Sequence, residues 1–309
     1  MGKINCINLW PTNFCMKTNK AGIQGLLLIV FSLLLTVIGT LLWVWISPFV
    51  ATVMGIPAVS WTGSLNYLKG LQLVSSVTTF LLPPVLLAYV LGQKVSSMLQ
   101  FHRVKSVAFW LLVIVSMLVA QPFINWLGDW NSRLSLPVWL SGVEHWMKNM
   151  EQQNETLVNR FLAVHSMQGL FFNVLLIAVI PAFAEEFFFR GVIQRLFAKK
   201  MNIHFAIWLT AFVFSAVHVE FYGFVPRLLL GAYLGYLFVW SGSIWIPVLA
   251  HFVNNFLGVL IGYWVANYSG YSYLDRIGIG HFAWLSVVSV LLFAVLVWLI
   301  TKQNKDSCV

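Results

Sequence analysis

The chain has 309 residues, of which 60% are hydrophobic and only 9% are charged. A soluble domain carries about a quarter charged residues, and a fold of this length could not hide so much apolar surface from water. The formal net charge of +9 does not indicate nucleic-acid binding, because the Lys and Arg residues form short clusters between apolar runs. Composition therefore predicts an all-α, polytopic membrane protein that has the lipid bilayer as a partner and binds no nucleic acid.

Apolar runs of a length that suits a bilayer core of about 30 Å follow the polar N-terminal tail. They lie at about residues 23–46, 71–91, 107–126, 169–189, 205–219, 227–240, 243–266 and 281–300, and the fifth and sixth are short. The sequence thus predicts a bundle of about eight transmembrane helices. We divide it into an N-terminal part (1–168), a core of four helices (169–266) and a last helix with its tail (267–309).

The distribution of basic residues predicts the orientation. With the N-terminus in the cytosol, twelve Lys and Arg residues fall on the cytosolic side and six on the other side. Cytosolic loops carry an excess of Lys and Arg, so this asymmetry favours both termini in the cytosol of a cell-membrane protein. An even number of spans is required for this arrangement.

The one long loop between apolar runs covers about residues 128–167 and falls on the outer side. Leu136, Trp139, Val143 and Trp146 recur there at spacings near three and four, which is typical of an amphipathic helix. We interpret this segment as a helix lying on the outer leaflet, where an interfacial anchor is a better explanation than a substrate guide.

Ionisable residues within a membrane span are costly, so each is a candidate functional group. The fourth run contains Glu185, Glu186 and Arg190, and helical periodicity extends it from about residue 169 to 199. Positions four apart share a helix face, so Glu186 is the expected partner of Arg190, whereas Glu185 points to another face.

Two further helices carry polar groups at a matching depth. His218 lies about seventeen residues after the turn near Met201, and Glu185 lies about sixteen before it. His251 and Asn255 are four residues apart, about two to three turns into the seventh run. These groups are expected to converge, and purely structural polar contacts between helices are an inferior explanation for so many of them.

The motifs Glu185-Glu186-x-x-x-Arg190, Phe214-x-x-x-His218 and His251-x-x-x-Asn255, in this order, resemble those of the CAAX-protease and bacteriocin-processing family of intramembrane endopeptidases. The resemblance covers about residues 169–262. It implies that Glu185 and His218 activate a water molecule, that His251 and Asn255 stabilise the oxyanion, and that the substrate is a membrane-associated peptide or protein. General chemistry is compatible with these roles, since buried carboxylates become stronger bases and fixed donors stabilise developing charge.

Alternatives remain at this point. Glu185, His218 and His251 could be ligands of a Zn²⁺ ion, although the sequence has no His-Glu-x-x-His pair on one helix. The chain could also be a non-catalytic immunity or scaffold protein, or a transporter. We expect no cofactor, and we expect the catalytic groups to open toward the cytosolic side that carries Arg195 and Lys200.

Overall fold

The computed structural model describes residues 21–271 and 273–306, so the N-terminal tail and the last three residues lie outside the described part. Every regular element in this part is helical. The α-helices in chain order are α1 (Ala21–Val53), α2 (Ala58–Trp61), α3 (Leu65–Ser76), α4 (Leu82–Val90), α5 (Val95–Met98), α6 (Val107–Ser132), α7 (Ser141–Leu162), α8 (Met167–Asn173), α9 (Ile180–Phe188), α10 (Gln194–Ala198), α11 (Ile203–Ala216), α12 (Phe224–Ser241), α13 (Trp245–Asn267) and α14 (Trp284–Asp306). Short π-helical segments join α3 to α4, α8 to α9 and α9 to α10.

Seven continuous helices in the described part are long and apolar enough to cross a membrane. They are Ala21–Val53, Leu65–Val90, Val107–Ser132, Met167–Ala198, Phe224–Ser241, Trp245–Asn267 and Gly280–Gln303. The expected fifth span corresponds to α11, an apolar helix of only 14 residues. The all-α, polytopic fold is confirmed, and the fifth helix is shorter than a full crossing requires.

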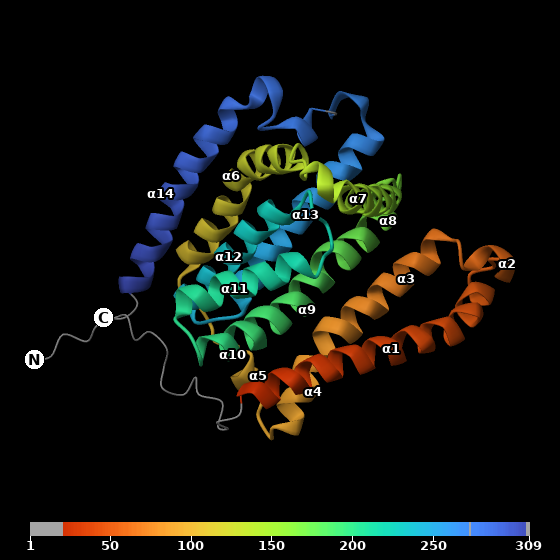
Figure 1. The fold of residues 1–309 in the computed structure, drawn as a ribbon, viewed down its shortest axis with the longest axis horizontal. Coiled ribbons are helices and arrows are strands. Elements are labelled where there is room, and N and C mark those ends of the chain that lie inside the picture. Colours follow the sequence, from red (N-terminus) through yellow and green to blue (C-terminus); the bar gives the residue numbers. More distant parts are fainter. Residues whose placement is uncertain (1–20, 272, 307–309) are drawn as a thin grey trace, which may run out of the picture.

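The bundle has two ends, which carry different segments (Figure 1). The start of α1, the connection between α10 and α11 and the end of α14 lie at the lower left. We call this end the Lys200 face. The α7 face, at the upper right, carries α7, the start of α8 and the end of α13. The chain passes between the two faces from each helix to the next, with α11 making a short pass.

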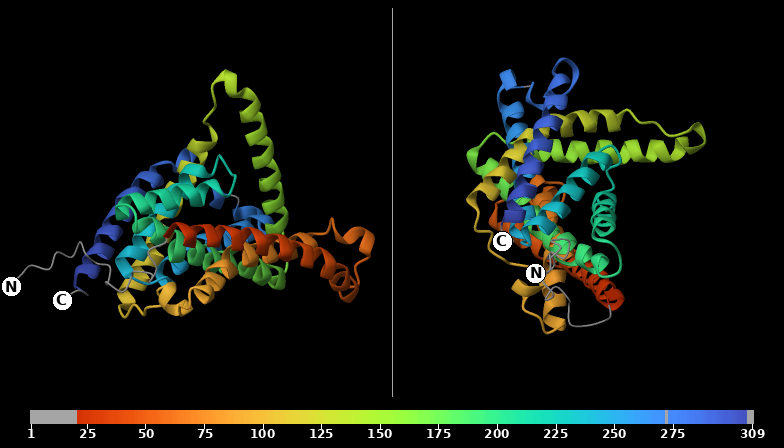
Figure 2. Two further views of the ribbon diagram at one scale, coloured as in Figure 1. Left: turned by 60° about the horizontal axis from the view of Figure 1, so that its bottom comes forward. Right: turned by 90° about the vertical axis from the view of Figure 1, so that its left-hand side faces the viewer.

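Helix α7 lies across the bundle helices. It is seen almost end-on in Figure 1 and stands out from the bundle in Figure 2. The predicted amphipathic helix therefore exists, but its start was placed too early. It begins at Ser141 and runs to Leu162, while Val138–Leu140 form a short 3-10 turn. Pro137 before that turn explains the late start, because proline disfavours helical backbone in the preceding residue.

Helices α11 and α12 approach closely because α12 carries glycine at two positions on one face. A Cβ atom at Gly231 would lie 3.2 Å from the Cβ of Ala211, and one at Gly235 would lie 2.9 Å from Ile207. The pattern Gly231-x-x-x-Gly235 therefore forms a close-packing surface. This contact holds the end of α11, and with it His218, against the start of α12.

Candidate active site

The two glutamates lie on α9, and the structure gives them different surroundings. Glu186 Oε1 is 2.7 Å from Arg190 Nη1, and both side chains are 0% exposed. Arg190 also donates to the carbonyl of Gly231 at 2.9 Å and stacks over the ring of Phe214. The predicted pairing of Glu186 with Arg190 is confirmed, and the pair forms a fully buried link between α9 and α12.

His251 on α13 is oriented by the same carboxylate. Its Nδ1 is 2.8 Å from Glu186 Oε1. An ionised carboxylate only accepts hydrogen bonds, so Nδ1 carries the hydrogen. The other ring nitrogen, Nε2, then faces Glu185 Oε2 at 3.8 Å. Glu186 therefore fixes both the ring and the tautomer of His251.

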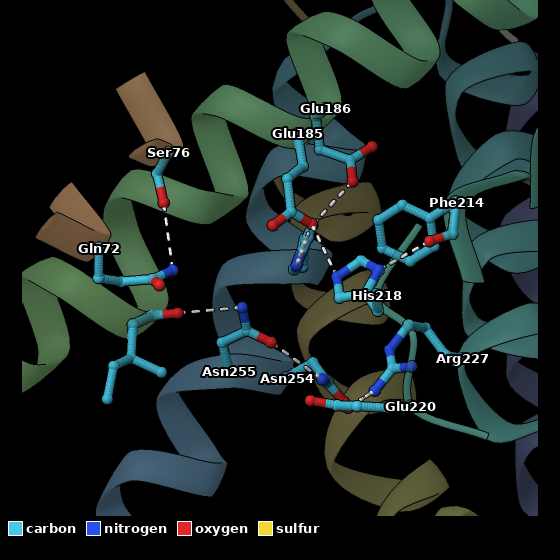
Figure 3. A network of polar contacts seen from close by, with 12 residues as sticks. Gln72, Ser76, Glu185, Glu186, Phe214, His218, Glu220, Arg227, Asn254 and Asn255 are labelled. Atoms are coloured by element: carbon cyan, nitrogen blue, oxygen red, sulfur yellow. Dashed lines mark hydrogen bonds and ion pairs between the residues drawn. The ribbon is translucent and has the colours of Figure 1, made fainter. Parts of the chain in front are cut away.

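His218 follows the end of α11 and is oriented in a similar way. Its Nδ1 donates to the carbonyl of Phe214 at 2.7 Å, which leaves Nε2 facing Glu185 Oε2 at 3.8 Å. Figure 3 shows both carboxylates above the His218 ring, with Phe214 beside it. Residues from three helices thus meet at Glu185, as the depth count predicted.

Glu185 is the carboxylate that a reactant can reach. Its side chain is 14% exposed, in contrast to the sealed side chain of Glu186. A separation of 3.8 Å is too long for a direct hydrogen bond between Glu185 and either imidazole. A water molecule beside Oε2 could contact the carboxylate and an Nε2 atom together. The arrangement is suited to taking a proton from water.

Asn255 lines the same cavity, and its amide is anchored. Nδ2 donates to the carbonyl of Ile177 at 3.1 Å, and Oδ1 accepts from Asn254 at 3.2 Å. Asn254 in turn accepts a long hydrogen bond from Gln121 at 3.4 Å. An amide nitrogen has two hydrogens, so one N–H of Asn255 remains available for a ligand.

These groups line a cavity of about 660 Å³ whose remaining walls lie toward the α7 face. On α9 and the preceding segment the lining residues are Leu176, Ile177, Pro181 and Glu185. On α13 they run from His251 to Val259, and α7 adds residues between Asn154 and Leu162. Each helix contributes its part nearer to α7, so the cavity extends from Glu185 toward that face.

The expected opening toward Arg195 and Lys200 is therefore wrong. From Glu185 the lining follows the helix back through Pro181 and Ile177 to Leu176, away from the connection between α10 and α11. Arg195 is also 3% exposed and donates to the carbonyl of Met98 instead of facing solvent.

Five further polar residues line the cavity and were not predicted as site residues: Gln72, Asn154, Glu220, Arg227 and Asn254. Asn254 is adjacent to a motif residue, which was the available signal. Glu220 lies on the connection between α11 and α12, Arg227 lies in the first turn of α12, and the two form an ion pair. Arg227 begins the apolar run at residues 227–240, and its charge entered only the count of basic residues.

Across residues 21–271 and 273–306, no three His, Cys, Asp or Glu side chains are arranged so that they could hold a metal ion. The zinc alternative uses Glu185, His218 and His251, and the Nε2 atom of each histidine lies 3.8 Å from Glu185 Oε2. Their donor atoms are of a type that binds zinc, but they do not form a closed set in this geometry.

Comparison with known proteins gives one family. Residues 167–257 match the model of the type II CAAX prenyl endopeptidase Rce1-like family. A relative, the uncharacterized protein YpbD of Bacillus subtilis (strain 168), is 28% identical over 85 residues. This alignment covers 26% of the chain and 41% of the relative. No solved structure matches the chain significantly.

The matched segment contains Glu185, His218, His251 and Asn255 together with the helices that position them. It coincides with the part of the chain on which the three motifs were found. Residues 167–257 are therefore similar to the Rce1-like family of CAAX-type membrane endopeptidases.

Proposed function

We propose that the chain is an intramembrane endopeptidase of the glutamate type, acting on a membrane-associated peptide or protein. The observation that carries the proposal is the convergence on Glu185. The Nε2 atoms of His218 and His251 both lie 3.8 Å from Glu185 Oε2, at the inner end of a cavity of about 660 Å³. The match of residues 167–257 to the model of a CAAX-type endopeptidase family supports the same class of reaction.

In this proposal Glu185 and His218 activate the water molecule. One proton of the water moves to the Glu185 carboxylate as the water oxygen attacks the carbonyl carbon of the peptide bond. His218 orients the water through Nε2, since its Nδ1–H is held by Phe214. The proton then passes to the leaving nitrogen as the carbon–nitrogen bond breaks. Atoms balance as one peptide and one water giving a carboxylic acid and an amine.

The oxyanion is stabilised by His251 and Asn255 in this proposal. Asn255 supplies the second N–H of its amide, whose position is fixed by the carbonyl of Ile177. His251 contributes through Nε2, the ring nitrogen that faces Glu185, and donates from it when both ring nitrogens carry hydrogen. Donors fixed in advance at the developing charge commonly lower a reaction barrier more than any other single contribution.

We further propose that the protein lies in the cell membrane with both termini in the cytosol, as the distribution of Lys and Arg favours. The start of α1 and the end of α14 share the Lys200 face. In this orientation the cavity, which extends toward α7, receives substrate from the non-cytosolic side.

The proposed activity is tested by comparing membrane peptides from cells with the parent protein, with Glu185→Gln and with Arg160→Gln. Arg160 on α7 does not line the cavity and serves as the control. A peptide produced by the parent and by Arg160→Gln, but not by Glu185→Gln, supports the proposal. Identical peptide sets from all three would refute it.

The zinc alternative is tested on the purified protein. We expect cleavage to persist after strong chelation, with zinc well below one equivalent. Stoichiometric zinc, whose removal and return switch cleavage off and on, would favour a metalloprotease with Glu185, His218 and His251 as ligands.

A further inference from the structure

Arg227 is the cationic residue that lines the active-site cavity in the described part of the chain. Arg190 is not available to a substrate, since it is fully buried and bound to Glu186 and Gly231. The side chain of Arg227 is 18% exposed, and in Figure 3 it lies to the lower right of the His218 ring, on the side away from Glu185. A positive group therefore stands in the cavity beyond the proposed water-activating residues.

The packing of α9 and its extension against α12 places Arg227 at the level of the site. Arg190 donates to the carbonyl of Gly231, and Gln194 donates to the carbonyl of Gly235. Both pairs are 41 residues apart, and both helices run from the α7 face toward the Lys200 face. The same offset brings Arg227 level with Glu186. Arg227 and Gly231 share a helix face with Gly235, and this face of α12 lies against α11 and the extension of α9.

The guanidinium of Arg227 is only partly satisfied. Nη2 is bonded to Glu220, whereas Nη1 is shielded from solvent and has no hydrogen-bond partner among the described residues. A buried donor without a partner is costly, which points to a ligand that completes it. A guanidinium presents paired N–H groups that match a carboxylate, and the N-terminal end of α12 also favours negative charge.

We propose that Arg227 binds a carboxylate of the peptide substrate and thereby selects peptides with an acidic group close to the cleaved bond. Glu220 is the resident counter-ion, which the substrate replaces. Its side chain is 29% exposed and lies on the connection between α11 and α12, so it has room to turn outward. This inference rests on the proposed endopeptidase function and names its substrate class.

The test uses the peptide identified by the comparison of membrane peptides, with the full-length protein in detergent. The peptide is synthesised in separate forms. One keeps all native carboxylates, one has the C-terminus as an amide, and each of the others has one acidic side chain as an amide. The parent should have a lower KM for the forms that keep one particular carboxylate. The amide form that loses affinity shows whether the recognised carboxylate is at the C-terminus or on a side chain.

The variants separate recognition from a structural role of the ion pair. Arg227→Gln should raise KM for the acidic peptide by about tenfold, as for a lost charged hydrogen bond, and should not change kcat. It should leave KM for the neutral peptide unchanged. Glu220→Gln should lower KM for the acidic peptide, because the competing carboxylate is gone. Arg160→Gln is the charge-matched control and should resemble the parent.

Opposite effects of the two substitutions on KM support the proposal. If both impair acidic and neutral peptides equally, the pair only holds the connection between α11 and α12, and the proposal is wrong. If Arg227→Gln does not fold, it is replaced by the double variant Glu220→Gln/Arg227→Gln, which removes both charges of the ion pair. A loss of acid preference in the double variant then supports the proposal, and retained preference overturns it.

A second measurement does not depend on cleavage. A cysteine at Asn154, which lines the cavity, is introduced in a chain whose native cysteines are replaced by serine. N-acetyl-leucyl-leucine as the free acid, but not as its amide, should slow maleimide labelling, and Arg227→Gln should abolish this difference. Equal protection by acid and amide would overturn the carboxylate site. Acid-specific protection without any Glu185-dependent cleavage would refute only the proposed function.

Discussion

The side-chain amide of Asn255 donates a hydrogen bond to the backbone carbonyl of Ile177, four residues before Pro181. Proline has no N–H group, so it cannot bond to the carbonyl one helical turn earlier. Asn255 supplies a donor in its place. Pro181 therefore contributes to the site because it leaves the carbonyl of Ile177 free to accept from Asn255 and hold its amide in position.

We predict that Pro181→Ala lowers kcat by about tenfold or more, because the restored backbone N–H competes with Asn255 for Ile177 and loosens the proposed oxyanion donor. The apparent Tm should not fall, since alanine favours an interior helix position more than proline. Pro247→Ala is the control, because Pro247 is in the first turn of α13, where an N–H has no intrahelical acceptor. Unchanged turnover in Pro181→Ala would exclude this role for the proline.

The adjacent glutamates should respond differently to the same substitution. Glu185→Gln should extract and melt like the parent and lose nearly all cleavage, since it removes the proposed base with little change of shape. Glu186→Gln should destabilise the protein by about 3–5 kcal/mol, because Arg190 is left as an uncompensated buried charge. Thermal melts and single-turnover cleavage on purified variants measure both effects.

A double variant provides the control for the different roles assigned to Glu185 and Glu186. Glu185→Gln combined with His218→Ala should be scarcely less active than either single variant, because groups that act as a unit are not additive. A stable but inactive Glu186→Gln, together with an active Glu185→Gln, would reverse the assignment of the two carboxylates.

The orientation is testable by labelling single cysteines in intact cells. A cysteine at Lys200 should react only when the reagent reaches the cytosol, whereas cysteines at Gln153 and Asn154 should react from outside. Arg195 is unsuitable as a reporter because it is buried. Reversed labelling would place both the termini and the cavity on the other sides of the membrane from those we propose.

Glu151 on α7 gives a prediction for the dependence of stability on pH. Burial, and after it the negative charge of Glu220, raise the pKa of its carboxyl. A raised pKa in the folded state means that stability is greatest when the group is protonated and is lost as the pH rises through the folded pKa. Glu151→Gln should therefore raise the apparent Tm at neutral pH, and the gain should vanish below about pH 4. Glu155→Gln, on an exposed position of α7, is the control.

Helical periodicity was sufficient to predict contacts within one helix. The bond between Glu186 and Arg190 follows from a spacing of four residues, and the convergence of Glu185 and His218 follows from counting residues to a shared turn. Such contacts depend on a rise and a rotation per residue that every α-helix shares. The number of spans does not follow in the same way, because hydropathy does not distinguish the 14-residue apolar helix α11 from a full crossing.

Contacts that depend on how one helix is rotated toward another could not be predicted. Nothing in the spacing of His251 indicates that its Nδ1 faces Glu186 or that the amide of Asn255 faces Ile177. The direction of the cavity was missed for a related reason. The direction of the cavity depends on how several helices and α7 are arranged around Glu185. That arrangement is not encoded in a single run of residues.

The shortness of α11 has a consequence for the surrounding lipid. Fourteen residues rise about 21 Å, some 9 Å less than a typical hydrocarbon core. Lipid next to this helix must compress, or headgroups and interfacial water must descend, to match its length. His218 stands directly after the end of α11, so this depression in the bilayer surface is centred close to the proposed site of hydrolysis. Membrane thickness, set by acyl-chain length, thereby becomes a physical determinant of how readily water reaches a peptide bond held there.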